Sequence, residues 1–291
     1  EGFTGLFTHY EKSGGRVIAW MTSRDGIEWS EWKDLSLLGQ GQYQSSGNRG
    51  KKIGSSFNYH PDRPVRGGLD FRTNLYYLES RDFGKTWTNV EGTPLTLPLK
   101  EVINPALVYD YDSEQRNVYI CDVSYDPKGR PVILYITTRG PMPGPEDGPR
   151  SWHTAWWNGK KWEIRDFTPA GNAYDMGSIY PERNKLWRII APTATGPQEY
   201  NTGGEMEMWI SKDQGRKWTK VRTLTGSSEF NHTYARRPVN AHPGFYAFWA
   251  DGHGRQPSES RLYFSDKEGN VSVLPRKMNG PFEKPARAGL R

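Results

Sequence analysis

Short apolar stretches alternate with polar, glycine-containing turns along the whole chain. Typical stretches cover residues 17–22, 75–79 and 206–210, and each is followed by a cluster of Ser, Asp and Gly. Apolar runs of this length bounded by turn residues predict β-strands, and no long helical periodicity competes with them. The chain is therefore expected to be all-β, with many short strands.

The strand signals fall into five consecutive units of up to four strands, labelled A to D from the centre outward. The first unit shows no innermost strand. The expected strands are B 5–10, C 16–22 and D 28–32 in unit one; A 42–46, B 53–59, C 73–79 and D 86–90 in unit two; A 118–125, B 132–138, C 154–157 and D 162–166 in unit three; A 177–180, B 187–192, C 206–210 and D 217–223 in unit four; A 234–239, B 245–250, C 262–264 and D 271–274 in unit five.

A turn motif recurs where strand C connects to strand D. Its best copies are SRDFGKTW (80–87) and SKDQGRKW (211–218); SRDGIEW (23–29) is one residue shorter, and WNGKKW (157–162) and SDKEGN (265–270) are eroded. The tryptophans at positions 29, 87, 162 and 218 lie 58, 75 and 56 residues apart. A period near 50 residues made of short strands predicts a β-propeller of four-stranded antiparallel blades.

The residue types of this motif suit a turn and not catalysis. Asp82 and Asp213 can accept hydrogen bonds from N–H groups inside the turn, and Gly84 and Gly215 can adopt a positive φ. The tryptophan that follows is expected to pack into the seam between neighbouring blades. We therefore expect the motif to hold the fold together.

The motif resembles the Asp-box, or bacterial neuraminidase repeat, of sialidases and other carbohydrate-active propellers, over most of residues 1–275. Further segments look like the neuraminidase-repeat proteins that include the propeller-fold ulvan lyases and related uronate-cleaving enzymes: NYHP (58–61), RTNLYYLES (72–80), YNTGGEM (200–206), NHTYARRPVNAHP (231–243) and SESRLYF (258–264). The resemblance implies a propeller enzyme that acts on uronate-containing anionic polysaccharide, with a polysaccharide lyase as the leading expectation.

We expect one β-propeller over residues 1–275 and a C-terminal tail, residues 276–291, that packs on the propeller or closes it. Five blades are visible, whereas related propellers usually have six or seven. The chain is therefore expected to be either part of a larger ring or a five-bladed ring in which the first segment or the tail supplies a missing strand, because ring closure removes exposed sheet edges.

Composition and charge limit the classes of molecule that this protein is expected to bind. The net charge of +6 comes from 39 basic and 33 acidic residues. No basic run is interleaved with aromatics, so we expect no nucleic acid, and the balance suits an anionic polysaccharide or oligosaccharide. No apolar run reaches the roughly 18 residues of a membrane span. The single Cys121 excludes an internal disulfide. We expect a secreted or periplasmic monomer, with its signal segment absent from this chain.

No spacing of His, Cys or acidic residues matches a zinc or calcium pattern. We therefore expect no metal in the site and no cofactor, although a structural calcium or zinc ion at the central channel is compatible with the fold.

Strand direction sorts the loops by face. The B–C loops and the D–A crossovers must share the face opposite the Asp-boxes, around the channel, where propeller ligand sites gather. The loop after NYHP contributes Arg63, Arg66, Asp70 and Arg72 to this face.

Elimination at a uronate needs a cation that neutralises the carboxylate, a base that removes the C5 proton and an acid that protonates the leaving oxygen. By resemblance to the ulvan lyases, which use His, Tyr and Arg in this way, the catalytic candidates are His60, Tyr174, His232 and Tyr234. The expected substrate-binding residues are Arg72, Arg236, Arg237, His253, Asn231 and Tyr200. Arg236 and Arg237 are adjacent in a strand, so at most one of them should reach the ligand and its neighbour should pair within the fold. Each candidate could instead serve the fold.

Two other classes of function compete with the lyase. A glycoside hydrolase, either sialidase-like or one that removes rhamnose or another cap next to a uronate, would need paired carboxylates, with Asp70, Asp175, Glu205 and Glu259 as candidates. Sialidase activity is less expected, because the only near match to a sialidase arginine motif, RRPV (236–239), follows the best boxes. A non-catalytic glycan-binding propeller is the second class. Gln42 favours it, because the family often has a histidine in this crossover and glutamine cannot transfer a proton.

Overall fold

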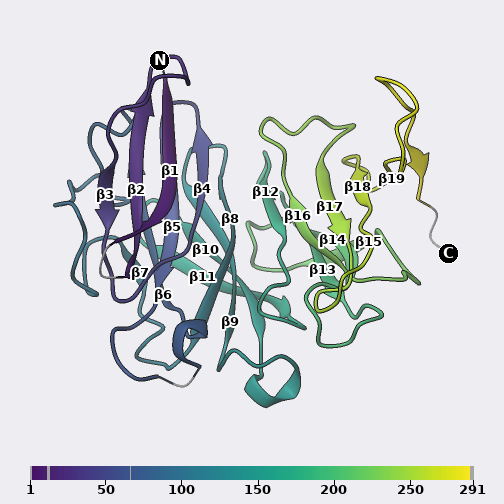
Figure 1. The fold of residues 1–291 in the computed structure, drawn as a ribbon, viewed down its shortest axis with the longest axis horizontal. Helices are drawn as coiled ribbons and strands as arrows, with labels where there is room; N and C mark the ends of the chain where they lie inside the picture. The colour runs from purple at the N-terminus through teal and green to yellow at the C-terminus, as the bar shows by residue number, and fades with distance from the viewer. Residues whose placement is uncertain (1, 12–13, 66, 289–291) are drawn as a thin grey trace. The chain divides into compact units, whose positions relative to one another are not determined.

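A computed structural model gives the fold of residues 2–11, 14–65 and 67–288. It is all-β, as predicted, and contains five antiparallel sheets (Figure 1). The strands, in sheet order, are β1 (Phe3–Tyr10), β2 (Arg16–Ser23), β3 (Lys33–Ser36); β4 (Gln44–Arg49), β5 (Lys52–Tyr59), β6 (Thr73–Ser80), β7 (Leu107–Tyr109); β8 (Asn117–Tyr125), β9 (Pro131–Thr138), β10 (Ser151–Trp157), β11 (Trp162–Pro169); β12 (Ser178–Pro181), β13 (Trp187–Ala194), β14 (Glu205–Ser211), β15 (Thr219–Thr223); and β16 (His232–Arg236), β17 (Ala247–Asp251), β18 (Leu262–Ser265), β19 (Val271–Val273), β20 (Ala286–Arg287).

The sheets are the blades of a β-propeller, numbered one to five in chain order. Two 3₁₀ turns, Gly68–Asp70 and Gly144–Asp147, lie in the B–C loops of blades two and three. The chain divides into two compact units, which are described separately below. The first contains residues 1–141 and 155–164, and the second contains residues 142–154 and 165–291.

Apolar side chains fill the seams between blades within each unit. In the first unit, Ile18 and Leu35 of blade one pack with Phe57 and Tyr76 of blade two. In the second unit, Ile190 and Met208 of blade four pack with Trp249 of blade five. All eight residues of β6 in blade two are buried, the polar ones included, so burial does not alternate along this strand.

Two outer strands differ from the prediction. The D strand of blade one is β3, residues 33–36, and not 28–32; that of blade two is β7, residues 107–109, and not 86–90. In blade two, Thr88 keeps one ladder position opposite Glu79. The chain then turns away because the Asn89 side chain accepts hydrogen bonds from the N–H groups of Glu91 and Thr93. A later segment therefore takes the edge of the blade.

The tail adds a fifth strand to blade five. β20 pairs with β19 in antiparallel register, with Val273 opposite Ala286. Within the described residues, no helix has the length and hydropathy needed to cross a bilayer.

The Asp-box turns have the predicted geometry. The Asp82 Oδ1 atom accepts a hydrogen bond from the Thr86 N–H at 2.9 Å, and the Ser80 hydroxyl accepts one from the Gly84 N–H at 2.8 Å. Asp213 likewise accepts from the Lys217 N–H at 2.9 Å. Gly84 has φ 82°, and a methyl group added there would lie 3.0 Å from the Trp20 ring. Glycine is therefore required at this position by both conformation and space.

Three box tryptophans pack against an aromatic side chain of the preceding blade. Ring centroids are 5.8 Å apart for Trp87 and Trp20, 5.6 Å for Trp162 and Tyr77, and 5.0 Å for Trp218 and Phe167. Trp87 is 2% exposed, whereas Trp29 of the shorter first box is 39% exposed. The seam role predicted for this tryptophan is thus seen in blades two, three and four, and Trp29 departs from it.

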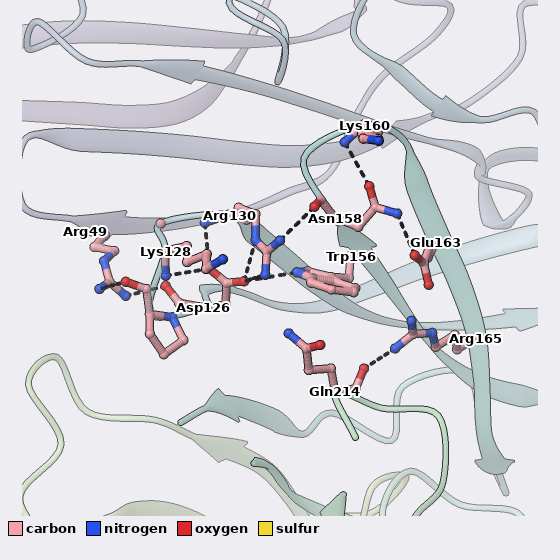
Figure 2. A network of polar contacts seen from close by, with 12 residues as sticks. Arg49, Asp126, Lys128, Arg130, Trp156, Asn158, Lys160, Glu163, Arg165 and Gln214 are labelled. Atoms are coloured by element: carbon pink, nitrogen blue, oxygen red, sulfur yellow. Dashed lines mark hydrogen bonds and ion pairs between the residues drawn. The ribbon is translucent and has the colours of Figure 1, made fainter. Parts of the chain in front are cut away.

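A hydrogen-bond network around Asp126 also joins blades two and three of the first unit. The Asp126 carboxylate closes the β8–β9 turn by accepting hydrogen bonds from the Lys128 and Arg130 N–H groups and from the Arg130 guanidinium (Figure 2). The Trp156 indole N–H also donates to this carboxylate, at 3.2 Å. From blade two, the Arg49 guanidinium donates to the Asp126 carbonyl. The turn is therefore held from both sides.

Replacing Trp87 by alanine should lower the free energy of unfolding of the first unit by about 3–5 kcal/mol, because a buried aromatic side chain leaves a cavity in the seam. Trp29→Ala is the matched control and should cost less than half as much, since that ring is already partly in solvent. Urea unfolding followed by far-ultraviolet circular dichroism measures both. Equal losses would show that the seam contact is not what Trp87 contributes.

Candidate functional site

Tyr43 is the centre of a cluster of polar and charged side chains in the first unit. It lies one residue before β4, at the end of the crossover from blade one. Its N–H donates to the Asn58 side chain and its carbonyl accepts from the Asn58 N–H, both at 3.2 Å. The Asn58 amide in turn donates to the Val118 carbonyl at 2.8 Å. Asn58 of the NYHP segment therefore fixes the position of Tyr43.

Two guanidinium groups lie over the Tyr43 ring. The central guanidinium carbon of Arg16 is 4.0 Å from the ring centroid, and that of Arg72 is 4.1 Å from it. Arg16 begins β2, so it comes from the B–C loop of blade one, whereas Arg72 precedes β6 and comes from the B–C loop of blade two. These loops and the crossover meet because alternating strand direction brings their ends to one face of the blades.

His60 packs edge-on against the same ring, with centroids 5.6 Å apart, and it is 3% exposed. Its Nδ1 atom is 3.1 Å from the Phe71 carbonyl oxygen. A carbonyl oxygen can only accept, so Nδ1 carries the proton and Nε2 has the lone pair. Burial lowers the pKa of His60, and the Arg72 cation lowers it further, to about 4. At neutral pH the imidazole is therefore an uncharged proton acceptor.

Arg72 is held by the first strand of blade three. Its carbonyl accepts a hydrogen bond from the Val118 N–H at 2.7 Å, and its guanidinium carbon lies 4.9 Å from the Tyr119 ring centroid. The Tyr119 hydroxyl donates to the Asp70 carbonyl at 3.1 Å. The guanidinium is thus buried among aromatic rings, where a cation interacts strongly with an anion.

Gln42 occupies the position at which the family often has a histidine, and its side chain points away from this cluster. Its side chain is fully buried and its amide donates to the Ser36 carbonyl at 2.8 Å. Adjacent residues of an extended chain face opposite sides, so Tyr43 is the residue that faces the cluster. Sequence reasoning missed both Tyr43 and Arg16; the alternation at positions 42 and 43 was the available signal.

The other residues predicted for a lyase site lie in the second unit. Both ring nitrogens of His232 form hydrogen bonds there. Its Nδ1 accepts a hydrogen bond from the Trp249 indole N–H at 3.0 Å, so Nε2 carries the proton and donates to the Ser228 hydroxyl at 2.9 Å. Burial lowers the pKa of His232. The Ser228 hydroxyl donates to the Glu205 carboxylate at 2.8 Å.

Asn231 and His253 both hold loops. The buried Asn231 amide donates to the Gln198 carbonyl at 3.0 Å and accepts from the Gln198 N–H at 3.0 Å. His253 Nδ1 accepts from the Arg255 N–H at 3.2 Å. Their assignment to substrate binding stays a prediction.

In the second unit, Arg236 and Arg237 each lie near a tyrosine ring. Tyr234 has φ 58° and is exposed, and the Arg236 guanidinium carbon lies 5.3 Å from its ring centroid. Arg237 lies 6.0 Å from the Tyr180 ring instead, so the two arginines meet different tyrosines. Tyr200 is also exposed. The Tyr174 N–H donates to the Asn172 side chain at 3.0 Å.

Three of the four carboxylates expected for a hydrolase, Asp175, Glu205 and Glu259, already have hydrogen-bond or ion-pair partners. Asp175 accepts hydrogen bonds from the N–H groups of Gly171, Asn172 and Gly203. Burial nevertheless raises the pKa of Asp175 to about 7. Glu205 accepts from the hydroxyls of Thr225 and Ser228, and Glu259 pairs with Arg276.

His60 and Arg72 therefore lie together in the first unit, and the other residues expected for a lyase lie in the second. That both groups share one pore stays a prediction. Arg66 lies outside the described residues. Within the described part of the chain, no group of three or more His, Cys, Asp or Glu side chains is arranged to hold a metal ion.

The sequence pattern of the BNR repeat-containing family matches residues 13–170, more than half of the chain. The chain belongs to this family. The search of curated proteins found no match to this chain.

Solved structures extend the comparison of this BNR-repeat protein to its fold. An ulvan lyase of polysaccharide lyase family 25 superposes with a TM-score of 0.69 at 18% identity, over 91% of this chain and 64% of the lyase. A complex of such a lyase with -[GlcA(1-4)Rha3S]- gives 0.68 at 17% identity, over 91% of this chain and 64% of that one. The sialidase of Trypanosoma rangeli gives 0.51 at 10% identity, over 89% of this chain and 43% of the sialidase. The BNR-repeat chain thus spans about two thirds of the length of these lyases, and its fold is that of propeller enzymes.

The His60 imidazole of this BNR-repeat protein should titrate near pH 4, and Arg72→Met should raise that midpoint because the nearby cation is removed. Two-dimensional NMR of the ring protons measures both. Arg63→Met is the control and should leave the midpoint unchanged, since Arg63 pairs with Asp112. A wild-type midpoint near the ordinary value of 6.5 would contradict the described environment.

The lowered pKa of His60 also predicts how the stability of the protein depends on pH. Because the pKa of His60 in the folded state is below 6.5, the unfolded state binds the proton first as the pH falls. Unfolding free energy should therefore decrease between about pH 6.5 and pH 4, and His60→Gln should remove that part of the pH dependence.

Proposed function

We propose that the protein is a polysaccharide lyase that cleaves a uronate-containing anionic glycan by β-elimination. The observation that carries the proposal is the arrangement of Tyr43, His60, Arg16 and Arg72: two cations over a tyrosine ring, beside an uncharged imidazole with an available lone pair. These are the three chemical parts that elimination at a uronate requires.

Each part has a task in the reaction. The guanidinium groups of Arg72 and Arg16 neutralise the uronate carboxylate, which makes the C5 proton easier to remove. The His60 Nε2 atom accepts that proton, and the electron pair of the C5–H bond forms the C4–C5 double bond. The C4–O bond breaks, and the Tyr43 hydroxyl donates its proton to the leaving oxygen. The products are an unsaturated uronate and a shortened chain with a new hydroxyl group.

The environment of His60 favours this role near neutral pH. Because burial and Arg72 lower its pKa to about 4, the imidazole stays uncharged at pH 7 and can accept a proton. Activity should fall at acid pH only as the imidazole becomes protonated, well below the usual histidine range. The Nδ1 proton, donated to Phe71, keeps Nε2 as the accepting atom.

The substrate class is argued from chemistry and from a structural neighbour. The chain has a net charge of +6, and the site presents two cations to a carboxylate. The lyase that superposes on this chain was solved with an oligosaccharide of glucuronate and sulfated rhamnose. We place the activity outside the cytoplasm, in the periplasm or the medium, because a polymeric anionic glycan does not cross a membrane.

A non-catalytic glycan-binding propeller is the second candidate, and Gln42 favours it. Its buried side chain cannot take the part that a histidine would play. Such a protein would bind the same glycan through Arg16, Arg72 and Tyr43 without cleaving it.

Incubation with ulvan should give absorbance near 235 nm, roughly where unsaturated uronates absorb. Tyr43→Phe and His60→Gln should each lower the rate by about 10²–10⁴-fold, as expected for the loss of a proton-transfer group, and Arg72→Met should act similarly through the carboxylate. Arg63→Met, in the same loop but paired with Asp112, is the matched control and should keep the wild-type rate.

Tyr174→Phe tests whether the second unit takes part in proton transfer, since its loss should also slow the reaction by about 10²–10⁴-fold if Tyr174 is catalytic. New reducing ends without absorbance near 235 nm would show a hydrolase. Binding with neither signal would show a binding module and overturn the lyase.

A further inference from the structure

The first Asp-box differs from the others in its length and in the placement of its tryptophan. It has seven residues where the boxes of blades two and four have eight, and its tryptophan is 39% exposed although Trp87 is buried. In blades two, three and four this ring packs into a seam with the preceding blade. In blade one the Trp29 ring folds back onto its own blade.

Glycines make room for two exposed rings at this place. A methyl group at Gly5 would lie 3.2 Å from the Trp29 ring, and one at Gly26 would lie 3.4 Å from the Phe3 ring. The Trp29 indole N–H donates to the Gly26 carbonyl at 3.2 Å. Phe3 is 53% exposed. Both rings rest on backbone, so they form a fixed aromatic platform that loses little conformational freedom when a ligand binds.

The platform lines a cavity of about 720 Å³ between the first and second boxes. Phe83 and Lys85 of the second box also line this cavity, as do Lys33 and Glu31. The volume is of the size that holds a small ligand. This cavity lies on the Asp-box side of the blades, whereas Tyr43 and His60 lie at the other ends of the strands, so the two sites are separate.

The chemistry of the lining matches a sugar. One face of a pyranose ring is made of C–H groups and stacks on an indole, while its hydroxyl groups need both donors and acceptors around the rim. Lys33 and Lys85 supply donors and can also meet a carboxylate or sulfate; Glu31 supplies an acceptor. The described residues form no ion pair with any of these three side chains, so all three can bind a ligand.

We infer that this cavity is a second saccharide-binding site, in which Trp29 stacks on a sugar unit of an anionic glycan and Lys85 binds its charged substituent. Only the choice of glycan rests on the proposed function. The site would hold the polymer on the Asp-box side of the first unit, away from the cluster around Tyr43.

Isothermal titration calorimetry with an ulvan tetrasaccharide tests the site, using His60→Gln as the parent protein so that cleavage is slowed by about 10²–10⁴-fold. Trp29→Ala should remove one equivalent of bound tetrasaccharide from the parent, and Lys85→Met should weaken that equivalent by about tenfold, as for one lost charge-assisted contact. Trp32→Ala is the matched control: Trp32 is also an exposed tryptophan of blade one, but it packs on Phe7 and His9 outside the cavity.

The two tryptophan variants have equal charge, so general attraction of a polyanion affects both alike. Equal stoichiometry in Trp29→Ala and Trp32→Ala, with both proteins folded by circular dichroism, would overturn the site. Failure of the lyase proposal is seen separately, as absence of the signal near 235 nm in the wild-type protein. Loss of an equivalent in Trp29→Ala would still support this site in that case.

Discussion

The packing of a box tryptophan on an aromatic ring of the preceding blade is the contact on which the arrangement of blades depends. It joins Trp87 to Trp20, Trp162 to Tyr77 and Trp218 to Phe167. The contact is long-range, but each half of it is prepared locally. In blade two, Asp82 and Ser80 accept hydrogen bonds from N–H groups of the turn, and Gly84 allows the Trp20 ring of blade one to approach. A sheet by itself could not bury both faces, so the seam supplies the burial that a single blade lacks.

The propeller geometry places the structural turns and the candidate site at opposite ends of the strands. The box turns occupy one end of the strands, and the crossover and B–C loops occupy the other. In the first unit those loops bring Arg16, Tyr43, His60 and Arg72 together although they are spread over 57 positions of sequence. Rigid strands on either side hold the cluster, and Asn58 ties the crossover to the neighbouring blade. A tyrosine between two cations and a neutral histidine is thereby fixed in place before any substrate arrives.

Much of the fold could be predicted from sequence because its determinants are local. Box turns and the inner strands follow from alternation and turn chemistry, and β5, β6, β9 and β13 agree closely with expectation. The outer strands of blades one and two were wrong because edge pairing is decided by where the chain returns, as with residues 107–109. In the site, His60 and Arg72 were found from the NYHP segment and its loop. Tyr43 and Arg16 were missed because their role depends on which way a residue faces at the start of a strand and on a contact between two blades.

The most direct test of the central claim is a crystal structure of the Tyr43→Phe protein with a uronate tetrasaccharide. The account predicts a uronate carboxylate within hydrogen-bonding distance of the Arg72 or Arg16 guanidinium, and the C5 atom of that sugar facing Nε2 of His60. A glycan bound beside Tyr234 and Arg236, with no sugar at the Arg16–Arg72 pair, would contradict it.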